Sequence, residues 1–279
     1  MRVNYEEKVF ENYFNAELSN YTRMVFSPGQ CLESLLGFDF MANIHCSYLD
    51  QIFGINQNLS GITKEVLETW LGRCLDNIPN ITANIFLQYK KPEYLTNSNA
   101  SEWCFWKEEY FRYNIYSEQQ EILQKLSEAI GDKGVVLYAS PAIKDVQELY
   151  DKYSDKKLIE NVNFQLASKL TGHHRNTYTS AGQHSIACSK PQQIKNFDFI
   201  NFLNSLNDYE TKNSLSNKEF IIETAEKISN EFKKLTSNFI VERNEKFRVS
   251  ESLYIITEFC KYYSLDWKLK TQVIYNDLD

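Results

Sequence analysis

The chain has 279 residues, a formal net charge of −7 at pH 7, a pI near 5.3, 43% hydrophobic residues and 24% charged residues. This is the composition of an ordinary globular protein with its own hydrophobic core, and no Gly-, Ser- or Pro-rich run is long enough to act as a linker or a disordered tail. The net negative charge argues against a protein that binds nucleic acid over its whole surface. It remains compatible with an enzyme whose basic residues are confined to one groove.

No stretch approaches the ~18 uncharged apolar residues that a membrane span needs, and the charged N-terminal segment does not resemble a signal peptide. The six cysteines stand singly among apolar and aromatic residues, which favours buried, reduced thiols over a disulfide framework. Together these features predict a cytoplasmic protein without a membrane partner.

Hydrophobic periodicity and the placement of Pro and Gly define the expected elements of the first half. In chain order these are helix 5–18, helix 29–36, strand 38–44, helix 63–78, strand 81–90, helix 118–130 and strand 135–139. An aromatic segment at 103–116 precedes the last of these helices, and its mixed charges favour core packing or a partner interface over base stacking. The order predicts a strand–helix–strand arrangement.

The second half is expected to be richer in helix. Its predicted elements are helix 143–153, a helix at about 158–170, an irregular stretch at 171–182, strand 184–188, and helices 197–206, 217–238 and 250–263. The predicted fold class is therefore α/β, with a small mixed sheet flanked by helices and a mainly helical C-terminal third. We expect an α/β core at 1–142 and a helical extension packed on it at 143–279, with one continuous domain as the alternative.

Four polar residues carry the clearest chemistry: Glu33, Asp39, Gln88 and Lys90. Side chains two positions apart in a strand share a face, so Gln88 and Lys90 are expected to project together, with Leu87 on the opposite face. Divalent metal catalysis on a phosphodiester needs oxygen ligands from a carboxylate and an amide, together with a cation that offsets charge. Asp39, Gln88 and Lys90 supply that set.

This pattern resembles the PD-(D/E)XK superfamily of nucleases, with its restriction-endonuclease-like core, and specifically the Mrr-like branch, in which Gln replaces the second acidic residue. The resemblance covers roughly residues 28–142. It implies that Asp39 and Gln88 bind Mg²⁺ or Mn²⁺, that Glu33 assists the metal site from its helix, and that Lys90 acts as a general acid–base or charge stabiliser.

A purely structural interpretation of these residues stays open. Asp39 could cap a helix or form an ion pair, Glu33 could be an exposed helix residue, and Gln88 and Lys90 could lie on the solvent face of an edge strand. Their co-occurrence in the expected order, with Lys91 adding positive charge beside Lys90, favours the nuclease-like site.

A second cluster, around residues 172–188, holds three of the four histidines of the chain. Its members are His173, His174, Arg175, Tyr178, His184 and Cys188. Side chains of the first four kinds donate to phosphates or stack on bases, so His173, His174, Arg175 and Tyr178, with Lys91, are predicted to contact nucleic acid. Two alternatives stay open: a zinc site formed by a histidine pair with Cys188, and a surface loop with incidental histidines.

The leading hypothesis is a metal-dependent DNA endonuclease that serves as the effector of a bacterial anti-phage system. It would act with a separate motor or sensor protein, because the chain carries no phosphate-binding loop of its own. The competing hypothesis is a non-catalytic protein-interaction subunit on the same fold. Homo-oligomer formation is left open.

Overall fold

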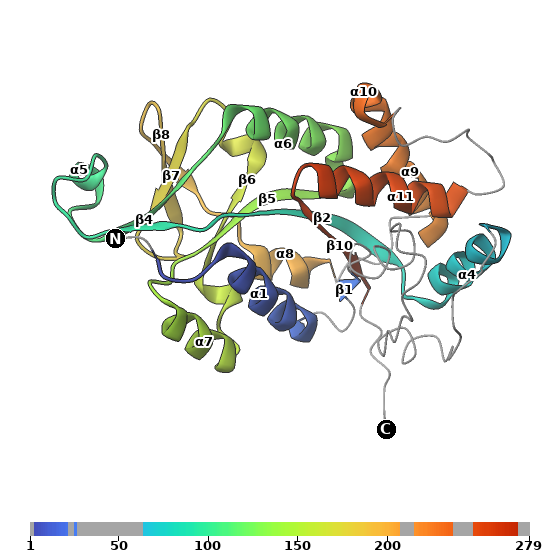
Figure 1. The fold of residues 1–279 in the computed structure, drawn as a ribbon, viewed down its shortest axis with the longest axis horizontal. Coiled ribbons are helices and arrows are strands. Elements are labelled where there is room, and N and C mark those ends of the chain that lie inside the picture. Colours follow the sequence, from blue (N-terminus) through green and yellow to red (C-terminus); the bar gives the residue numbers. More distant parts are fainter. Residues whose placement is uncertain (1–2, 22–24, 27–63, 207–214, 237–247, 273–279) are drawn as a thin grey trace.

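The computed structural model describes residues 3–21, 25–26, 64–206, 215–236 and 248–272. The predicted helix 29–36 and strand 38–44 lie outside these residues. In the described part, two five-stranded sheets are flanked by helices, and a helical region precedes the last strand (Figure 1). The fold is therefore mixed α/β.

The first sheet is mixed and has the strand order β1-β10-β2-β5-β6. Its strands are β1 (Val25–Phe26), β2 (Ile81–Tyr89), β5 (Gly134–Pro141), β6 (Val162–Leu166) and β10 (Asp266–Thr271). β2 and β5 are parallel, and the connection between them runs through two strands of the second sheet and then helix α6 (Ser117–Ile130), whereas the other pairs are antiparallel. The predicted strand–helix–strand arrangement of this region is confirmed.

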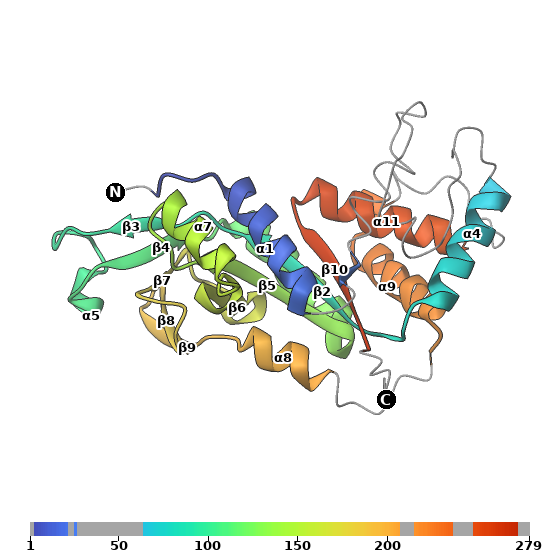
Figure 2. The ribbon, with the colours of Figure 1, turned by 90° about the horizontal axis from the view of Figure 1, so that it is seen from below.

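The second sheet is antiparallel throughout, in the order β3-β4-β7-β8-β9. Its strands are β3 (Glu93–Leu95), β4 (Tyr110–Asn114), β7 (Arg175–Tyr178), β8 (His184–Cys188) and β9 (Gln192–Lys195). The chain passes directly from β2 into β3, so the second sheet lies beyond one end of the first. The short helix α5 (Trp103–Trp106) is at the outer tip, and α4 (Lys64–Asn77) is at the other end of the molecule (Figure 2).

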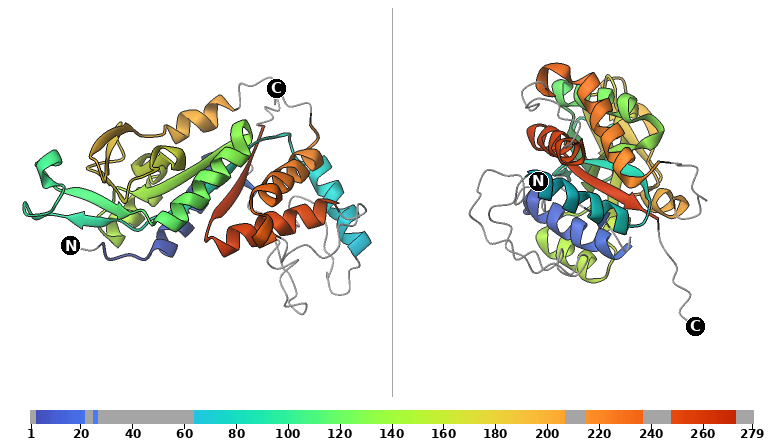
Figure 3. Two further views of the ribbon diagram at one scale, coloured as in Figure 1. Left: turned by 90° about the horizontal axis from the view of Figure 1, so that it is seen from above. Right: turned by 90° about the vertical axis from the view of Figure 1, so that its right-hand side faces the viewer.

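Helices cover both faces of the first sheet. On one face α1 (Glu7–Tyr21) and α8 (Phe199–Ser205) meet the strands, with Phe14 of α1 packed against Tyr89, Phe164 and Phe199. On the other face lie α6, α9 (Asn217–Glu231) and α11 (Arg248–Tyr262) (Figure 3). Helix α7 (Val146–Ser154) packs against α1. The short helix α10 (Lys233–Thr236) packs against α9 and α11. β2 is consequently buried on both faces.

One predicted helix, at about 158–170, is wrong. This segment forms β6 between two short 3₁₀ turns, Ile159–Asn161 and Ala167–Lys169. Val162 and Phe164 alternate with Asn163 and Gln165, which is the period of a strand. The polar pair is buried because Asn163 and Gln165 both donate to Ser185 Oγ, at 3.0 and 3.1 Å. Burial of these amides hides the usual contrast between an apolar and a polar strand face.

The C-terminal part contributes more strand than the predicted elements indicated. Part of the stretch predicted to be irregular, 171–182, is β7, and β10 lies in the middle of the first sheet between β1 and β2. Residues after 142 therefore supply strands to both sheets, in addition to the helices α7 to α11. The helical region that was predicted is present, and it packs over a sheet that it helps to complete.

Candidate functional site

Gln88 is the penultimate residue of β2, and Lys90 directly follows the strand, with its N–H still donating to the Ala139 carbonyl of β5 at 2.9 Å. As strand alternation predicts, they share one face of β2, and Leu87 and Tyr89 share the other, where the Tyr89 ring packs against Phe10. Both polar side chains are nevertheless buried, with Gln88 5% and Lys90 9% exposed. The interpretation of a solvent-facing strand is therefore wrong, because Gln119 of α6 lies against both side chains on this face.

A glutamine from α6 joins the two side chains. Gln119 Nε2 donates to Gln88 Oε1 at 2.7 Å, and Lys90 Nζ donates to Gln119 Oε1 at 2.6 Å. Gln119 lies in the first turn of α6, the helix that precedes β5. Gln119 was not among the predicted site residues, because an amide near a helix start gives no signal in the sequence that it contacts β2, from which β3 and β4 separate it in the chain.

The ammonium group of Lys90 lies in an aromatic and amide environment. Its Nζ is 5.3 Å from the ring centre of Tyr116 and 5.6 Å from that of Tyr138. Within the described ranges Lys90 takes part in no ion pair at 4.0 Å or less. Burial lowers the pKa of Lys90 to about 8, against a smaller opposing effect of Glu7. Lys90 therefore gains and loses a proton near physiological pH.

Lys91 is held differently. Its Nζ forms an ion pair with Glu6 Oε1 at 3.2 Å, and its backbone N–H donates to Glu7 Oε2 at 2.9 Å. Burial raises the pKa of Glu7, which the Lys91 N–H and the neighbouring lysines partly offset. The predicted positive charge beside Lys90 is thus balanced by carboxylates at the start of α1.

The two predicted carboxylates, Glu33 and Asp39, lie outside the described residues. Their approach to Gln88 and Lys90 stays a prediction. Among the residues that the structure describes, no group of three or more His, Cys, Asp or Glu side chains could hold a metal ion. Gln88 is the one predicted metal ligand in the described part, and its Oε1 already accepts a hydrogen bond from Gln119.

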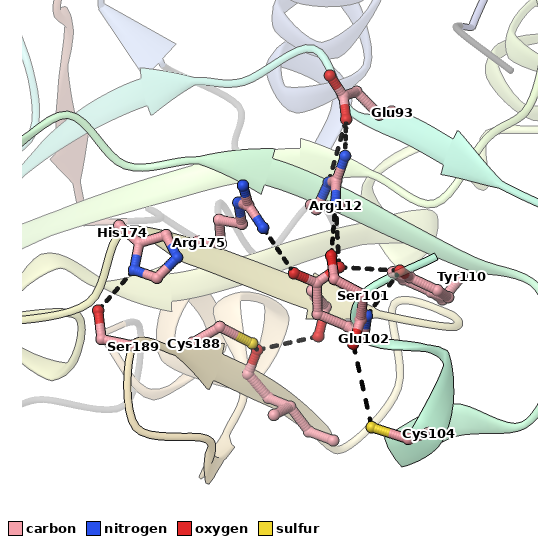
Figure 4. A network of polar contacts seen from close by, with 12 residues as sticks. Glu93, Ser101, Glu102, Cys104, Tyr110, Arg112, His174, Arg175, Cys188 and Ser189 are labelled. Carbon is pink, nitrogen blue, oxygen red and sulfur yellow. Dashed lines mark hydrogen bonds and ion pairs between the residues drawn. The ribbon is translucent and has the colours of Figure 1, made fainter. Parts of the chain in front are cut away.

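The histidine cluster is spread along the second sheet. His174 Nδ1 is 2.6 Å from Ser189 Oγ (Figure 4). His184 instead stacks on Trp106 with ring centres 5.6 Å apart. Burial, with the nearby His174, lowers the pKa of His173. The Cys188 thiol is buried, and it donates to the Ile186 carbonyl at 3.6 Å. The histidines and Cys188 thus have different partners, and none of these contacts brings them together as a zinc ligand set.

Tyr178 must be removed from the residues predicted to contact nucleic acid. It lies on β7 and is fully buried, and its hydroxyl donates within the core to Ser140 Oγ, at 2.7 Å, or to the Pro141 carbonyl, at 3.1 Å. Its ring stacks on Phe111 and is 0% exposed, so it is not available to a base. Tyr178 instead ties the second sheet to β5 of the first.

Arg175 belongs to an ionic network around the buried Glu102 that the sequence did not indicate. Glu102 Oε1 accepts from Arg175 Nη1 at 2.9 Å, and Glu102 Oε2 accepts from Arg112 Nη1 at 3.0 Å and from the Tyr110 hydroxyl at 2.9 Å (Figure 4). Arg112 also donates to Glu93 through Nε and Nη2. Burial alone would raise the pKa of Glu102, but the donors around it, Arg175 first among them, lower it to about 2.

Comparisons of the chain with protein-family models, with curated proteins and with solved structures found no match. Within the described ranges, no helix is long and apolar enough to cross a membrane.

Proposed function

We propose that the chain is a metal-dependent DNA endonuclease with a restriction-endonuclease-like site, in which Lys90 is the cation that acts on the phosphodiester. One observation carries the proposal: Gln88 and Lys90 lie side by side on β2, joined by Gln119, and the buried Lys90 has no ion-pair partner in the described part of the chain. The order of β2, α6 and β5 agrees with the order in the PD-(D/E)XK resemblance.

The environment of Lys90 suits an anionic substrate. Burying an ammonium group costs free energy unless an anion or several acceptors compensate it, and Gln119 Oε1 is the single hydrogen-bond acceptor that Lys90 Nζ has among the described residues. A phosphate group would supply the missing charge. With its pKa near 8, Lys90 could either offset charge on the phosphate or transfer a proton.

The proposed metal ion, Mg²⁺ or Mn²⁺, requires ligands beyond those in the described residues. Gln88 offers an amide oxygen, which is a suitable ligand for a hard cation, provided that Gln119 turns away. Asp39 would supply the carboxylate, and Glu33 would assist. When bound, such an ion would polarise the phosphodiester and activate water.

The biological setting belongs to the same proposal. The enzyme would be a cytoplasmic effector of bacterial anti-phage defence that receives its DNA from a motor or sensor protein. This setting comes from the resemblance alone. If the protein binds a partner but does not cleave DNA, the alternative of a non-catalytic interaction subunit is the better explanation.

The test is cleavage of plasmid and single-stranded DNA by the purified protein with Mg²⁺ or Mn²⁺. We expect the wild type to cleave DNA, and we expect EDTA to abolish this cleavage. Asp39→Ala and Lys90→Ala should each reduce the cleavage rate at least a hundredfold. Lys125→Ala, an exposed lysine on α6 that pairs with Glu121, is the charge-matched control and should cleave normally. Full activity of folded Lys90→Ala protein, or no cleavage by the wild type with either metal, would overturn the proposal.

A further inference from the structure

The segment 96–109, which connects β3 to β4, is attached to the second sheet in an unusual way. Every residue in it is exposed or half-buried except Glu102, which is 4% exposed. Surface segments usually attach through apolar side chains, because burial of a carboxylate costs free energy unless charged donors compensate it. Here the carboxylate is itself the attachment.

The donors that hold Glu102 come from two neighbouring strands. Arg112 and Tyr110 lie on β4, and Arg175 lies on β7, which pairs with β4. Arg112 is held independently by Glu93, through Nε at 3.1 Å and Nη2 at 2.6 Å, which leaves Nη1 for Glu102. Glu93 would therefore hold the Arg112 side chain in position even if Glu102 moved away.

We propose that Arg112, Arg175 and Tyr110 form a phosphate-binding site, the arginine cradle, which Glu102 occupies in place of a backbone phosphate of nucleic acid. Two guanidinium groups and a hydroxyl are donors of the kind that bind phosphate oxygens. The choice of nucleic acid as the source of the phosphate rests on the proposed function, whereas the arginine cradle itself does not.

The remaining attachment of the segment is polar and lies near the surface. Trp106 Nε1 donates to Thr177 Oγ1 at 3.0 Å and its ring stacks on His184, Arg112 Nη1 also donates to Ser101 Oγ at 3.4 Å, and Glu109 accepts a hydrogen bond from Tyr94 and lies 3.9 Å from Lys144 Nζ. Of the side chains in the segment, Glu102 is the one that is buried. The Arg175 side chain is already 34% exposed. Because Glu102 stays ionised at ordinary pH, a competing anion rather than a proton would release it.

The first test measures binding of a fluorescein-labelled 20-nucleotide single strand in EDTA, by fluorescence anisotropy. Glu102→Ala should bind at least tenfold more tightly at 0.15 M salt, and the slope of log Kd against log salt should steepen by about 0.7, the value for one phosphate contact on a single strand. Arg175→Ala added to Glu102→Ala should remove much of the gain. Glu108→Ala, which removes an exposed carboxylate of the same segment, is the matched control.

Equal affinities and slopes for folded Glu102→Ala and Glu108→Ala would overturn the arginine cradle. Inorganic phosphate distinguishes the two sources of the ligand. Competition at millimolar phosphate would identify a free phosphate group as sufficient, and absence of competition, with tight strand binding, would identify the nucleic-acid backbone.

A second measurement uses the wild-type chain, in case Glu102→Ala does not fold. If a strand displaces Glu102, the segment should detach, and trypsin should cleave after the exposed Lys107 at least threefold faster when the oligonucleotide is present. Cleavage after Lys152, on α7, is the internal reference. An unchanged or slower rate at Lys107 would contradict the proposal. Both tests are done without metal, so a chain that lacks nuclease activity can pass them and an active nuclease can fail them.

Discussion

Lys90 Nζ donates a hydrogen bond of 2.6 Å to Gln119 Oε1, and this contact joins the end of β2 to the first turn of the helix that follows it toward β5. Since the acceptor is a neutral amide, the contact does not compensate the charge of Lys90. The protein therefore keeps a buried ammonium group at a free-energy cost, and that cost can be measured.

The first prediction concerns the pH dependence of stability. The pKa of Lys90 is about 8 in the folded chain, against the ordinary lysine value of 10.5 in the unfolded chain. Between pH 8 and pH 10.5 the unfolded chain therefore binds more protons at Lys90 than the folded chain does. The contribution of Lys90 to the free energy of unfolding consequently rises with pH over this range. Lys90→Met should be more stable than the wild type at pH 7, by on the order of 1–3 kcal/mol. This advantage should shrink as the pH rises from 8 to 10, as measured by urea denaturation.

Because cysteines and tyrosines also titrate in this range, the informative quantity is the difference between variant and wild type. Lys125→Met removes an exposed lysine and should show no such change with pH. A Lys90→Met difference that stays constant from pH 7 to 10 would show that Lys90 is not desolvated.

The second prediction concerns Gln119→Glu. A carboxylate in place of the amide would lie in direct contact with the Lys90 ammonium group, which should raise the pKa of Lys90 by at least one unit. The pKa can be followed by NMR of the protein after ¹³C reductive methylation of its lysines. An unchanged pKa would mean that the two side chains are not in contact in solution.

The third prediction concerns the opposite face of β2. Leu87 is fully buried, so Leu87→Asp should unfold the chain or cost several kcal/mol through an unpaired buried carboxylate. Val146→Asp is the matched control, because Val146 is 45% exposed at the first turn of α7, where a carboxylate is favourable. A cooperatively melting Leu87→Asp protein with wild-type stability would mean that the two faces of β2 are assigned the wrong way round.

The fourth prediction compares two glycines. A Cβ atom at Gly134 would lie 2.2 Å from the backbone oxygen of Asn84, because β5 begins close against β2 there. Gly134→Ala should therefore destabilise the chain by about 1–3 kcal/mol. Gly72 lies within α4 and would meet only the flexible end of Lys218, so Gly72→Ala should be neutral or stabilising by up to ~1 kcal/mol. In thermal melts, Gly134→Ala should lower the midpoint and Gly72→Ala should leave it unchanged or raise it, and equal shifts would contradict the close approach.

The sequence predicted those elements whose apolar residues follow a clear period and end at Pro or Gly. Helix 118–130 and strand 81–90 are present within a residue or so, and the shared face of Gln88 and Lys90 follows from strand geometry alone. Sequence patterns failed where the buried residues are polar. Asn163 and Gln165 are buried with hydrogen-bond partners, and the sequence predicted a helix where they form β6.

Contacts between distant segments were also beyond sequence reasoning. Gln119 is 31 residues from Gln88, and Arg175 is 73 residues from Glu102, and no local period links such pairs. Tyr178 shows the converse error. Its neighbours His173, His174 and Arg175 suggested a polar loop, but the strand that follows turns Tyr178 into the core.

The position of β10 has a consequence for how the chain is made. β10 pairs with β2 through five residues in regular register before a shift at Lys270, and it lies between β2 and β1. During synthesis, residues 81–89 leave the ribosome long before residues 266–271, so β2 has one open edge for most of translation. An open hydrophobic edge can pair with other chains. We therefore expect nascent chains that stop before residue 266 to aggregate or recruit chaperones, whereas chains released with β10 should remain monodisperse, and sedimentation of the two products would distinguish these outcomes.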